Sequence, residues 1–371
     1  IVWMRILEPI IYRFIIEERF LEMNPILECC LEDLEARINP EEEDRLYQSW
    51  LDFIHGRCTT SYFLPKRVGP APARINWPEV SVNSTLEDFD QMALQQYRLC
   101  SQQLEKADGN LLNVRCNYGT SIIPLLFGVQ PFIMEESANT LPISHPLNDL
   151  DAIQRLIEQG VPDLSKGFGE TVLAMGEYFK QIGKQYTKIG RYVHLYHPDL
   201  QGPMDICELV WGSRLFLDVV DHPEMVHDFL ALVTETYTAY MRAWEKVIPF
   251  QTDGNVHWGM LHKGTIMLRD DSGTNFSRRM YEKFILPYDQ RLLNEFGGGA
   301  IHFCGKGDHF ITLLGEMHGL HAVQLSQPHL NDMSKVYQHT VDRGIKLIGL
   351  DYSAVEQAIQ AGIDLKGQVH C

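Results

Sequence analysis

The sequence has a deficit of positively charged residues. Its 32 lysine and arginine residues stand against 49 aspartate and glutamate residues, which gives a net charge of −17. A phosphate backbone or an anionic membrane surface repels such a chain, and no local stripe of lysine and arginine offsets the balance. We therefore expect neither nucleic acid nor a membrane as a partner. Small molecules and other proteins remain as the expected partners.

The chain also lacks a long uninterrupted hydrophobic run. Residues 1–20 are rich in apolar side chains, but Arg5, Glu8 and Arg13 are among the charged residues that interrupt them at helical spacing. This pattern predicts an amphipathic helix, which is neither a transmembrane span nor a signal peptide. The eight cysteines likewise show no secreted-scaffold spacing. We expect reduced thiols and a cytoplasmic protein.

No glycine-rich phosphate loop of the G-x-G-x-x-G type follows the first predicted strand. The segment there is Cys116-Asn117-Tyr118-Gly119-Thr120. The only consecutive glycines, 297–299, precede a strand and do not begin a helix. An open, doubly wound nucleotide-binding sheet fits the strand pattern nearly as well as a barrel does, but the missing loop disfavours it.

The composition is that of a globular protein, with 45% hydrophobic and 22% charged residues in 371. Residues 1–109 have helical patterns, and Pro40 followed by three glutamates is a strong helix start. Residues 59–83 contain four prolines and no sustained period, which predicts a loop. We expect residues 1–109 to form a helical N-terminal extension packed on the remainder or on a second copy of the chain.

Residues 110–371 alternate short apolar runs with amphipathic stretches, a pattern typical of repeated β-α units. The predicted strands are 111–116, 192–196, 265–268, 300–303, 322–325, 346–350 and 367–370. The predicted helices are 150–159, 169–189, 223–247, 278–296, 310–317, 333–343 and 354–361. With 257–261 as the missing eighth strand, the α/β pattern predicts a TIM (β/α)8-type barrel.

Polar residues gather where these strands end, the edge at which barrel enzymes carry their active sites. Taken singly, Asp199, Asp271 and Ser326 are read more simply as helix caps. The remaining candidates form two groups. Those that could orient a substrate or move a proton are Asp270, Arg269, His197 and Tyr118; those that could bind a substrate are Arg115, Asn117 and Gln324.

The most specific feature is His302-x-Cys304. Alternate residues of a strand face the same side, so imidazole and thiolate can reach one ion, and that pairing favours zinc. Cys371 ends the last predicted strand and would be a third ligand. Three protein ligands with an open position are typical of catalytic zinc. One alternative to a catalytic zinc site is that Cys304 is an ordinary buried core cysteine. Another is a structural zinc site, in which His309, Glu316 or His370 supplies a fourth protein ligand.

The order of several short motifs resembles the uroporphyrinogen decarboxylase superfamily over residues 110–371. These motifs are Gln201-Gly202-Pro203, Asp270-Asp271, the segment 276–281, Leu286-Pro287-Tyr288 and the segment 301–307. The resemblance implies a TIM barrel.

Within that superfamily the chain is more similar to the zinc-dependent, corrinoid-linked methyltransferases, whose His-x-Cys and distant cysteine match His302, Cys304 and Cys371. True decarboxylases carry an acid shortly after the first strand, whereas 126–132 contains none. The resemblance implies zinc, a corrinoid (cobalamin) on a separate protein, and a small methyl donor or acceptor. Uroporphyrinogen decarboxylase and a non-catalytic tetrapyrrole- or corrinoid-binding barrel are the alternatives.

Overall fold

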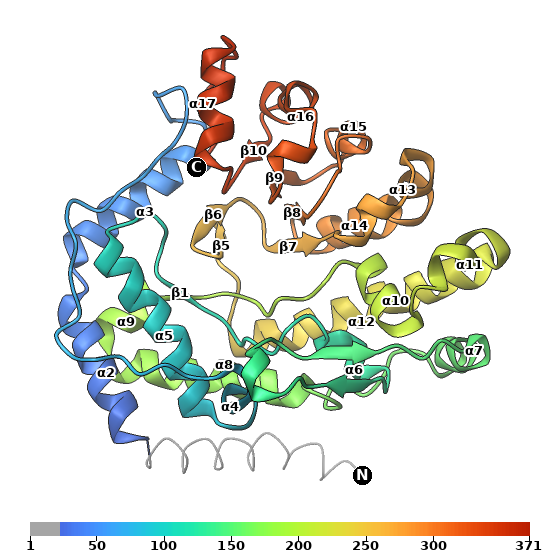
Figure 1. The fold of residues 1–371 in the computed structure, drawn as a ribbon, viewed down its shortest axis with the longest axis horizontal. Coiled ribbons are helices and arrows are strands. Elements are labelled where there is room, and N and C mark those ends of the chain that lie inside the picture. The colour runs from blue at the N-terminus through green and yellow to red at the C-terminus, as the bar shows by residue number, and fades with distance from the viewer. Residues whose placement is uncertain (1–22) are drawn as a thin grey trace.

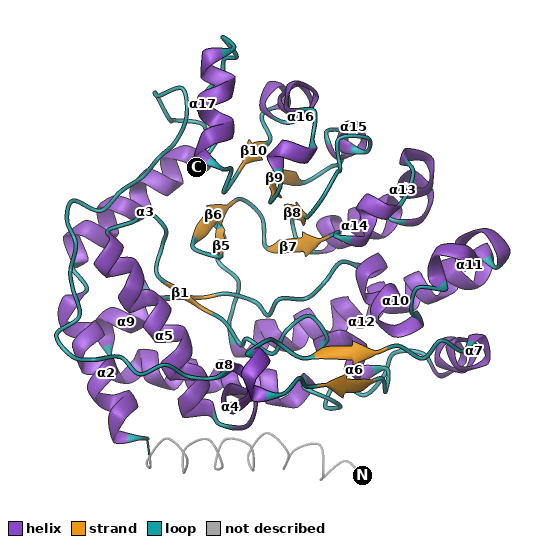
Figure 2. Ribbon diagram, in the orientation of Figure 1, coloured by secondary structure: helices purple, strands orange, loops and turns teal. Residues whose placement is uncertain are grey.

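The computed structural model describes residues 23–371. The amphipathic helix predicted for residues 1–20 lies outside the described residues. The parallel strands lie around the centre of the molecule and the helices lie around them (Figures 1 and 2). Among the described residues, none of the helices combines the length and the apolar character needed to cross a bilayer.

Residues 23–109 contain four helices, and their caps explain where the helices begin. Pro40 follows Asn39, whose side chain accepts the backbone N–H of Glu41, and the acidic first turn favours the helix dipole. Asp88 caps the long helix before the first strand in the same way. The helices are α2 (Pro25–Arg37), α3 (Pro40–Ile54), α4 (Val82–Glu87) and α5 (Phe89–Lys106).

The proline-rich segment between α3 and α4 contributes one residue to the strand arrangement. Phe63 forms a parallel bridge with His370. Its N–H donates to the carbonyl of Val369 at 2.7 Å, and the N–H of Cys371 donates to the carbonyl of Phe63 at 3.2 Å. The chain therefore joins its N-terminal section to its last residues through backbone hydrogen bonds.

Six of the seven predicted parallel strands are present, and residues 367–370 form only isolated parallel bridges. The strands predicted at 111–116, 192–196 and 346–350 are shorter than predicted, and the other three are as long or longer. One sheet has the order β10-β9-β8-β7, and a separate parallel pair joins β1 to β4. Val369 extends the larger sheet beyond β10 through a parallel bridge to Leu347. The strands are β1 (Asn113–Val114), β4 (His194–Leu195), β7 (Ile266–Arg269), β8 (Gly299–Phe303), β9 (Leu320–Leu325) and β10 (Lys346–Leu347). The protein is thus an α/β protein with parallel strands, and the two described parallel sheets share no strand.

The candidate eighth strand, residues 257–261, is not a parallel strand. It spans the turn of an antiparallel hairpin between β5 (Asn255–His257) and β6 (Met260–His262). The backbone reverses at Trp258 and Gly259, which both have positive φ angles, of 50° and 79°. A run of apolar and aromatic residues conceals this reversal, because tryptophan is rare in such a turn. A second antiparallel hairpin, β2 (Gln130–Phe132) with β3 (Ile143–His145), was not predicted.

Helices cover the outside of the strands (Figure 2). Two predicted helices are broken: residues 169–189 at Tyr186, and 278–296 at Ile285, where Pro287 cannot continue the preceding helix. The helices that follow α5 are α6 (Ile122–Leu126), α7 (Leu150–Gln159), α8 (Gly169–Gln185), α9 (Thr187–Tyr192), α10 (Pro203–Trp211), α11 (Leu215–Asp221), α12 (Pro223–Val247), α13 (Arg278–Phe284), α14 (Leu286–Glu295), α15 (Ile311–Leu314), α16 (Met333–His339) and α17 (Tyr352–Gln360).

Two buried apolar clusters hold these layers together. The larger runs from Leu27 to Val369 and includes side chains on both sides of the boundary predicted at residues 109/110. The smaller packs Trp50 and Phe53 of α3 against Met267 and Ala300 of the central strands. Burial of such rings stabilises the fold by about 25 cal/mol per Å² of apolar area. The sheet that carries His302 is therefore closely packed against α3.

Candidate metal centre

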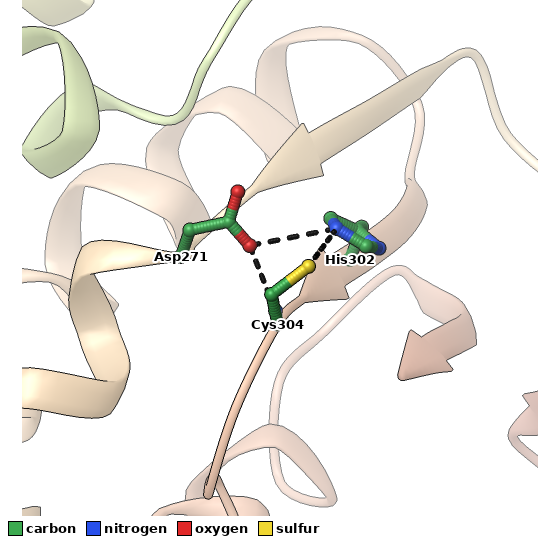
Figure 3. A group of neighbouring side chains, drawn as sticks. All are labelled: Asp271, His302 and Cys304. Carbon is green, nitrogen blue, oxygen red and sulfur yellow. Dashed lines mark hydrogen bonds and ion pairs between the residues drawn. The ribbon is translucent and has the colours of Figure 1, made fainter. Parts of the chain in front are cut away.

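The candidate site lies where β7 and β8 end side by side. The two strands are parallel, with Arg269 opposite His302, so the residues that follow them leave the sheet at the same edge. The N–H of Asp270 donates to the carbonyl of His302 at 2.8 Å. The N–H of Cys304 donates to the Asp271 carboxylate at 2.7 Å. Asp271, His302 and Cys304 are thereby placed around one point (Figure 3).

The three side chains offer one ligand atom each, and these atoms all lie within 4.8 Å of one another. The Cys304 sulfur is 3.3 Å from Nε2 of His302, and the nearer oxygen of Asp271 is 3.4 Å from the same nitrogen. The side chain of His302 is 10% exposed and that of Asp271 is 43% exposed. The group is therefore anchored on the buried sheet and open to solvent on the carboxylate side.

The donor set fits zinc. Nitrogen, sulfur and oxygen donors together suit zinc, whereas magnesium and calcium require oxygen donors. Nδ1 of His302 donates to the amide oxygen of Gln324 on β9, which leaves Nε2 to face the thiol and the carboxylate. A hydrogen bond on the far ring nitrogen is the usual way in which a protein orients a metal-binding histidine.

The charges of this group support one another. Burial lowers the pKa of His302, but hydrogen bonds to Asp271 and Cys304 outweigh this and raise it to about 9. Burial raises the pKa of Asp271, but interactions with His302 and, to a smaller extent, with Cys304 outweigh burial and lower that pKa. Metal binding would replace the proton that His302 holds between these partners.

A cationic cluster adjoins the triad. Arg269 and Arg115 both pair with the carboxylate of Asp199. Arg269 also donates to the carbonyl of Leu200 at 2.9 Å, and its guanidinium lies 4.6 Å from the ring centre of Trp258. Burial lowers the pKa of Arg269 to about 10, so it is charged at neutral pH. Two guanidinium groups sharing one carboxylate leave one positive charge in excess.

Three other predicted site residues are buried in contacts of their own. Tyr118 is fully buried, with its ring 5.3 Å from that of Phe168. Asn117 donates to Gln95 at 3.4 Å. Both ring nitrogens of His197 contact backbone groups: Nδ1 donates to the carbonyl of Pro198, and Nε2 accepts the N–H of Met267. Burial lowers the pKa of His197 to about 3. His197 is thus neutral at physiological pH and engaged at both nitrogens.

Asp270 is buried beside a second acid. It is 2% exposed, accepts the hydroxyl of Tyr281 at 2.9 Å, and lies within hydrogen-bonding reach of the fully buried Asp289. Burial raises the pKa of both carboxyl groups, most strongly that of Asp289. Two adjacent buried carboxylates cannot both be charged without a cation, so the pair holds a shared proton.

This pair predicts a pH-dependent stability. The fold keeps a proton that the unfolded chain releases near pH 3.8, so the stabilisation is complete below that pH and is lost as the pH rises through the raised value. We expect Asp289→Asn to flatten the fall in unfolding free energy between pH 4 and 6, the window between the ordinary carboxyl pKa of 3.8 and the pKa of about 6 of Asp270. This fall can reach about 1.4 kcal/mol per pH unit.

Urea unfolding at the two pH values measures this slope. Asp151→Asn, on an exposed acid at the start of α7, is the matched control and should leave the slope unchanged. An unchanged slope in Asp289→Asn would contradict the shared proton.

Cys371, the predicted third metal ligand, lies outside the triad. It follows the extended segment beside β10, and β9 and β10 lie between that segment and β8. The converging group of ligand atoms does not include the Cys371 sulfur. Burial raises the pKa of its thiol to about 11. Its part in metal binding remains a prediction, and Asp271 is the residue that the structure brings to His302 and Cys304.

Sequence reasoning missed the position of Asp271 and that of Trp258. The sequence favours a helix cap at Asp271, yet this residue follows the strand that pairs with β8, and adjacent parallel strands deliver their next residues to one edge. The adjacency of β7 and β8 was the signal from which the position of Asp271 could have been inferred. Trp258, whose ring centre lies 5.1 Å from that of His302, was placed inside a predicted strand.

Comparison with known proteins finds a likeness in structure but none in sequence. No family model matches the chain, and no curated protein matches it. A solved structure described as a methyltransferase from Methanosarcina mazei superposes with a TM-score of 0.58 at 15% sequence identity. The match covers 88% of this chain and 91% of that one. The likeness extends over nearly the whole of both chains and shows a shared fold.

Proposed function

We propose that the protein is a zinc-dependent methyltransferase that moves a methyl group between a small molecule and a corrinoid carried by a separate protein. The observation that carries the proposal is the convergence of Asp271, His302 and Cys304 within 4.8 Å at the ends of two neighbouring parallel strands. The fold likeness to a methyltransferase and the resemblance in motifs support it.

We further propose that the strands form a TIM-type barrel. The parallel order from β7 to β10, extended by Val369 and Phe63, accounts for most of one wall, and β1 with β4 supplies the facing part. In such a barrel the triad occupies the edge at which the strands end, where barrel enzymes bind their substrates.

Zinc would be held by His302 and Cys304, with Cys371 as the third ligand that the resemblance implies. Zinc acts as a Lewis acid: it lowers the pKa of a bound thiol or polarises the heteroatom that carries the methyl group. Asp271 already accepts the N–H of Cys304, so it fixes the turn that presents the thiol. Its exposed carboxylate is placed to accept a proton from an incoming thiol.

Among the predicted substrate-handling residues, Arg269 and Gln324 lie beside this group. Gln324 holds the ring of His302, and Arg269 places a buried positive charge next to Trp258. Tyr118, His197 and Asp270 are engaged elsewhere in the fold, where they support the strands and loops around the site. The chemistry is therefore assigned to the strand ends of β7, β8 and β9.

The test begins with the metal content of the purified protein, for which we expect one zinc per chain by mass spectrometry. Demethylation of free methylcobalamin by a panel of small thiols, followed by absorbance, is then expected to stop after zinc removal by a chelator. It should return when zinc is added back. Full methyl-transfer activity without zinc would overturn the role proposed for the metal. Decarboxylation of uroporphyrinogen by the metal-free protein would overturn the proposal in favour of the decarboxylase alternative.

A further inference from the structure

The turn between β5 and β6 carries a residue that does not suit it. Hairpins with two-residue turns favour asparagine or glycine where both residues have positive φ, because a Cβ atom is strained there. Gly259 meets this requirement, with a φ of 79°, and a Cβ added to it would lie 2.8 Å from Asn110. Trp258 has a φ of 50° but is neither asparagine nor glycine, so it does not meet the requirement. A bulky side chain in this region is a genuine outlier.

The surrounding structure holds the turn in place. The N–H of Leu111, next to β1, donates to the carbonyl of Gly259 at 2.8 Å. Across the hairpin, His257 and His262 share a hydrogen bond of 2.7 Å and are both buried. Strain of this kind persists where neighbours over-determine the backbone, and it concentrates at functional sites.

The strained backbone directs the indole between two charged or metal-binding groups. One neighbour is the guanidinium of Arg269, 4.6 Å from the ring centre. The other is the imidazole of His302, whose ring centre is 5.1 Å away at an interplanar angle of 76°. These are the geometries of a cation–π contact and an edge-to-face aromatic contact. Trp258 thus connects the arginine cluster to the candidate ligand.

The imidazole of His302 is consequently held from two directions. Gln324 fixes its Nδ1 by a hydrogen bond, and the indole of Trp258 packs on the ring. A hydrogen bond alone allows the ring to tilt about that contact, whereas a packed aromatic neighbour resists the tilt. Together they keep Nε2 directed at Cys304 and Asp271.

We propose that Trp258 is a positioning residue of the metal site, kept in a strained turn so that its indole fixes the orientation of the His302 ring. This inference rests on the proposed zinc site and adds to it a residue that touches no ligand atom. Asparagine at position 258 suits the turn but lacks the ring, and phenylalanine keeps an aromatic ring in the strained turn.

Zinc affinity, measured by competition with a chromophoric chelator, tests the inference. We expect Trp258→Asn to weaken zinc binding about 10-fold, as loss of a supporting contact to a metal-binding histidine does. Trp258→Phe should recover most of the affinity. Ala107→Gly, at another position of positive φ, 53°, at the end of α5, is the control for relief of backbone strain and should leave affinity unchanged.

A metal-free measurement separates this inference from the proposed function. In protein labelled with 15N-histidine, the Nδ1–H of His302, assigned by its absence from His302→Gln, should give a sharp, slowly exchanging NMR signal. Trp258→Asn should broaden or remove it and Trp258→Phe should retain it. If the wild type binds no zinc, the proposed function fails and the NMR comparison alone decides the role of Trp258. An unchanged signal in Trp258→Asn would overturn the inference, whatever its zinc affinity.

Discussion

Cys304→Ala is expected to bind zinc at least about 100-fold more weakly than the wild type and to lose zinc-dependent methyl transfer. Loss of a residue that merely supports a ligand costs 10- to 100-fold, so loss of a ligand costs more. The thiol is 3.3 Å from Nε2 of His302 at the open end of β8, outside both apolar clusters. The unfolding temperature of the metal-free variant should therefore stay close to that of the wild type. Zinc stoichiometry and thermal unfolding, measured on the same samples, check the expected loss of zinc and the expected unchanged stability.

Cys29→Ser provides the matched control for this experiment, because Cys29 is an exposed free thiol on α2. It should keep both zinc and activity. A Cys304→Ala protein that retains a full equivalent of tightly bound zinc would show that the metal lies elsewhere or is held without this thiolate. A variant that fails to fold is recognised by its thermal transition, and Cys304→Ser then repeats the test with a near-isosteric side chain.

The second large effect concerns the third ligand, for which Cys371 and Asp271 compete. We expect Cys371→Ser to lose zinc as completely as Cys304→Ala does, and Asp271→Asn to retain it with 10- to 100-fold lower affinity. The reason is that the Asp271 carboxylate already accepts the N–H of Cys304 at 2.7 Å, the role of an orienting neighbour. A second thiolate also suits zinc better than a carboxylate does. Zinc titrations of the two variants under identical conditions measure the difference.

The opposite ranking would assign the third position to Asp271 and make Cys371 a bystander. Cys58→Ser, which changes a thiol that contacts Thr60 and is half-buried like that of Cys371, controls for general effects of removing a half-buried cysteine. If Cys371→Ser and Cys58→Ser behave alike, the ligand set implied by the family resemblance is wrong at this residue.

Sequence patterns predicted much of the fold because its elements carry local signals. The helix at 223–247 begins after a histidine with proline at its first position, and its boundaries are those predicted. The strands 300–303 and 322–325 are short apolar runs bounded by glycine and polar residues, and both lie in the parallel sheet. His302 and Cys304 converge because a strand repeats every two residues, which a sequence shows directly.

What the sequence could not show depends on contacts between distant segments. The turn at Trp258 is maintained by Leu111 and Arg269, and without those partners the segment resembles a strand. Asp271 belongs to the candidate site because β7 pairs with β8, a fact of topology rather than of local pattern. The break at Ile285 was signalled by Pro287, but helical periodicity on both sides concealed it.

The pairing of Phe63 with His370 has a consequence for how the molecule is made. The two residues are 370 − 63 = 307 positions apart, and one parallel bridge joins them. During synthesis, Phe63 leaves the ribosome long before its partner exists, at the usual rate of about 5–20 residues per second. The wall of strands beside Cys371 therefore closes only after nearly the whole described chain has emerged. Contacts of such long range form slowly, because the chain entropy is lost before the contact is gained. Assembly of the predicted ligand set is thus a late event in folding.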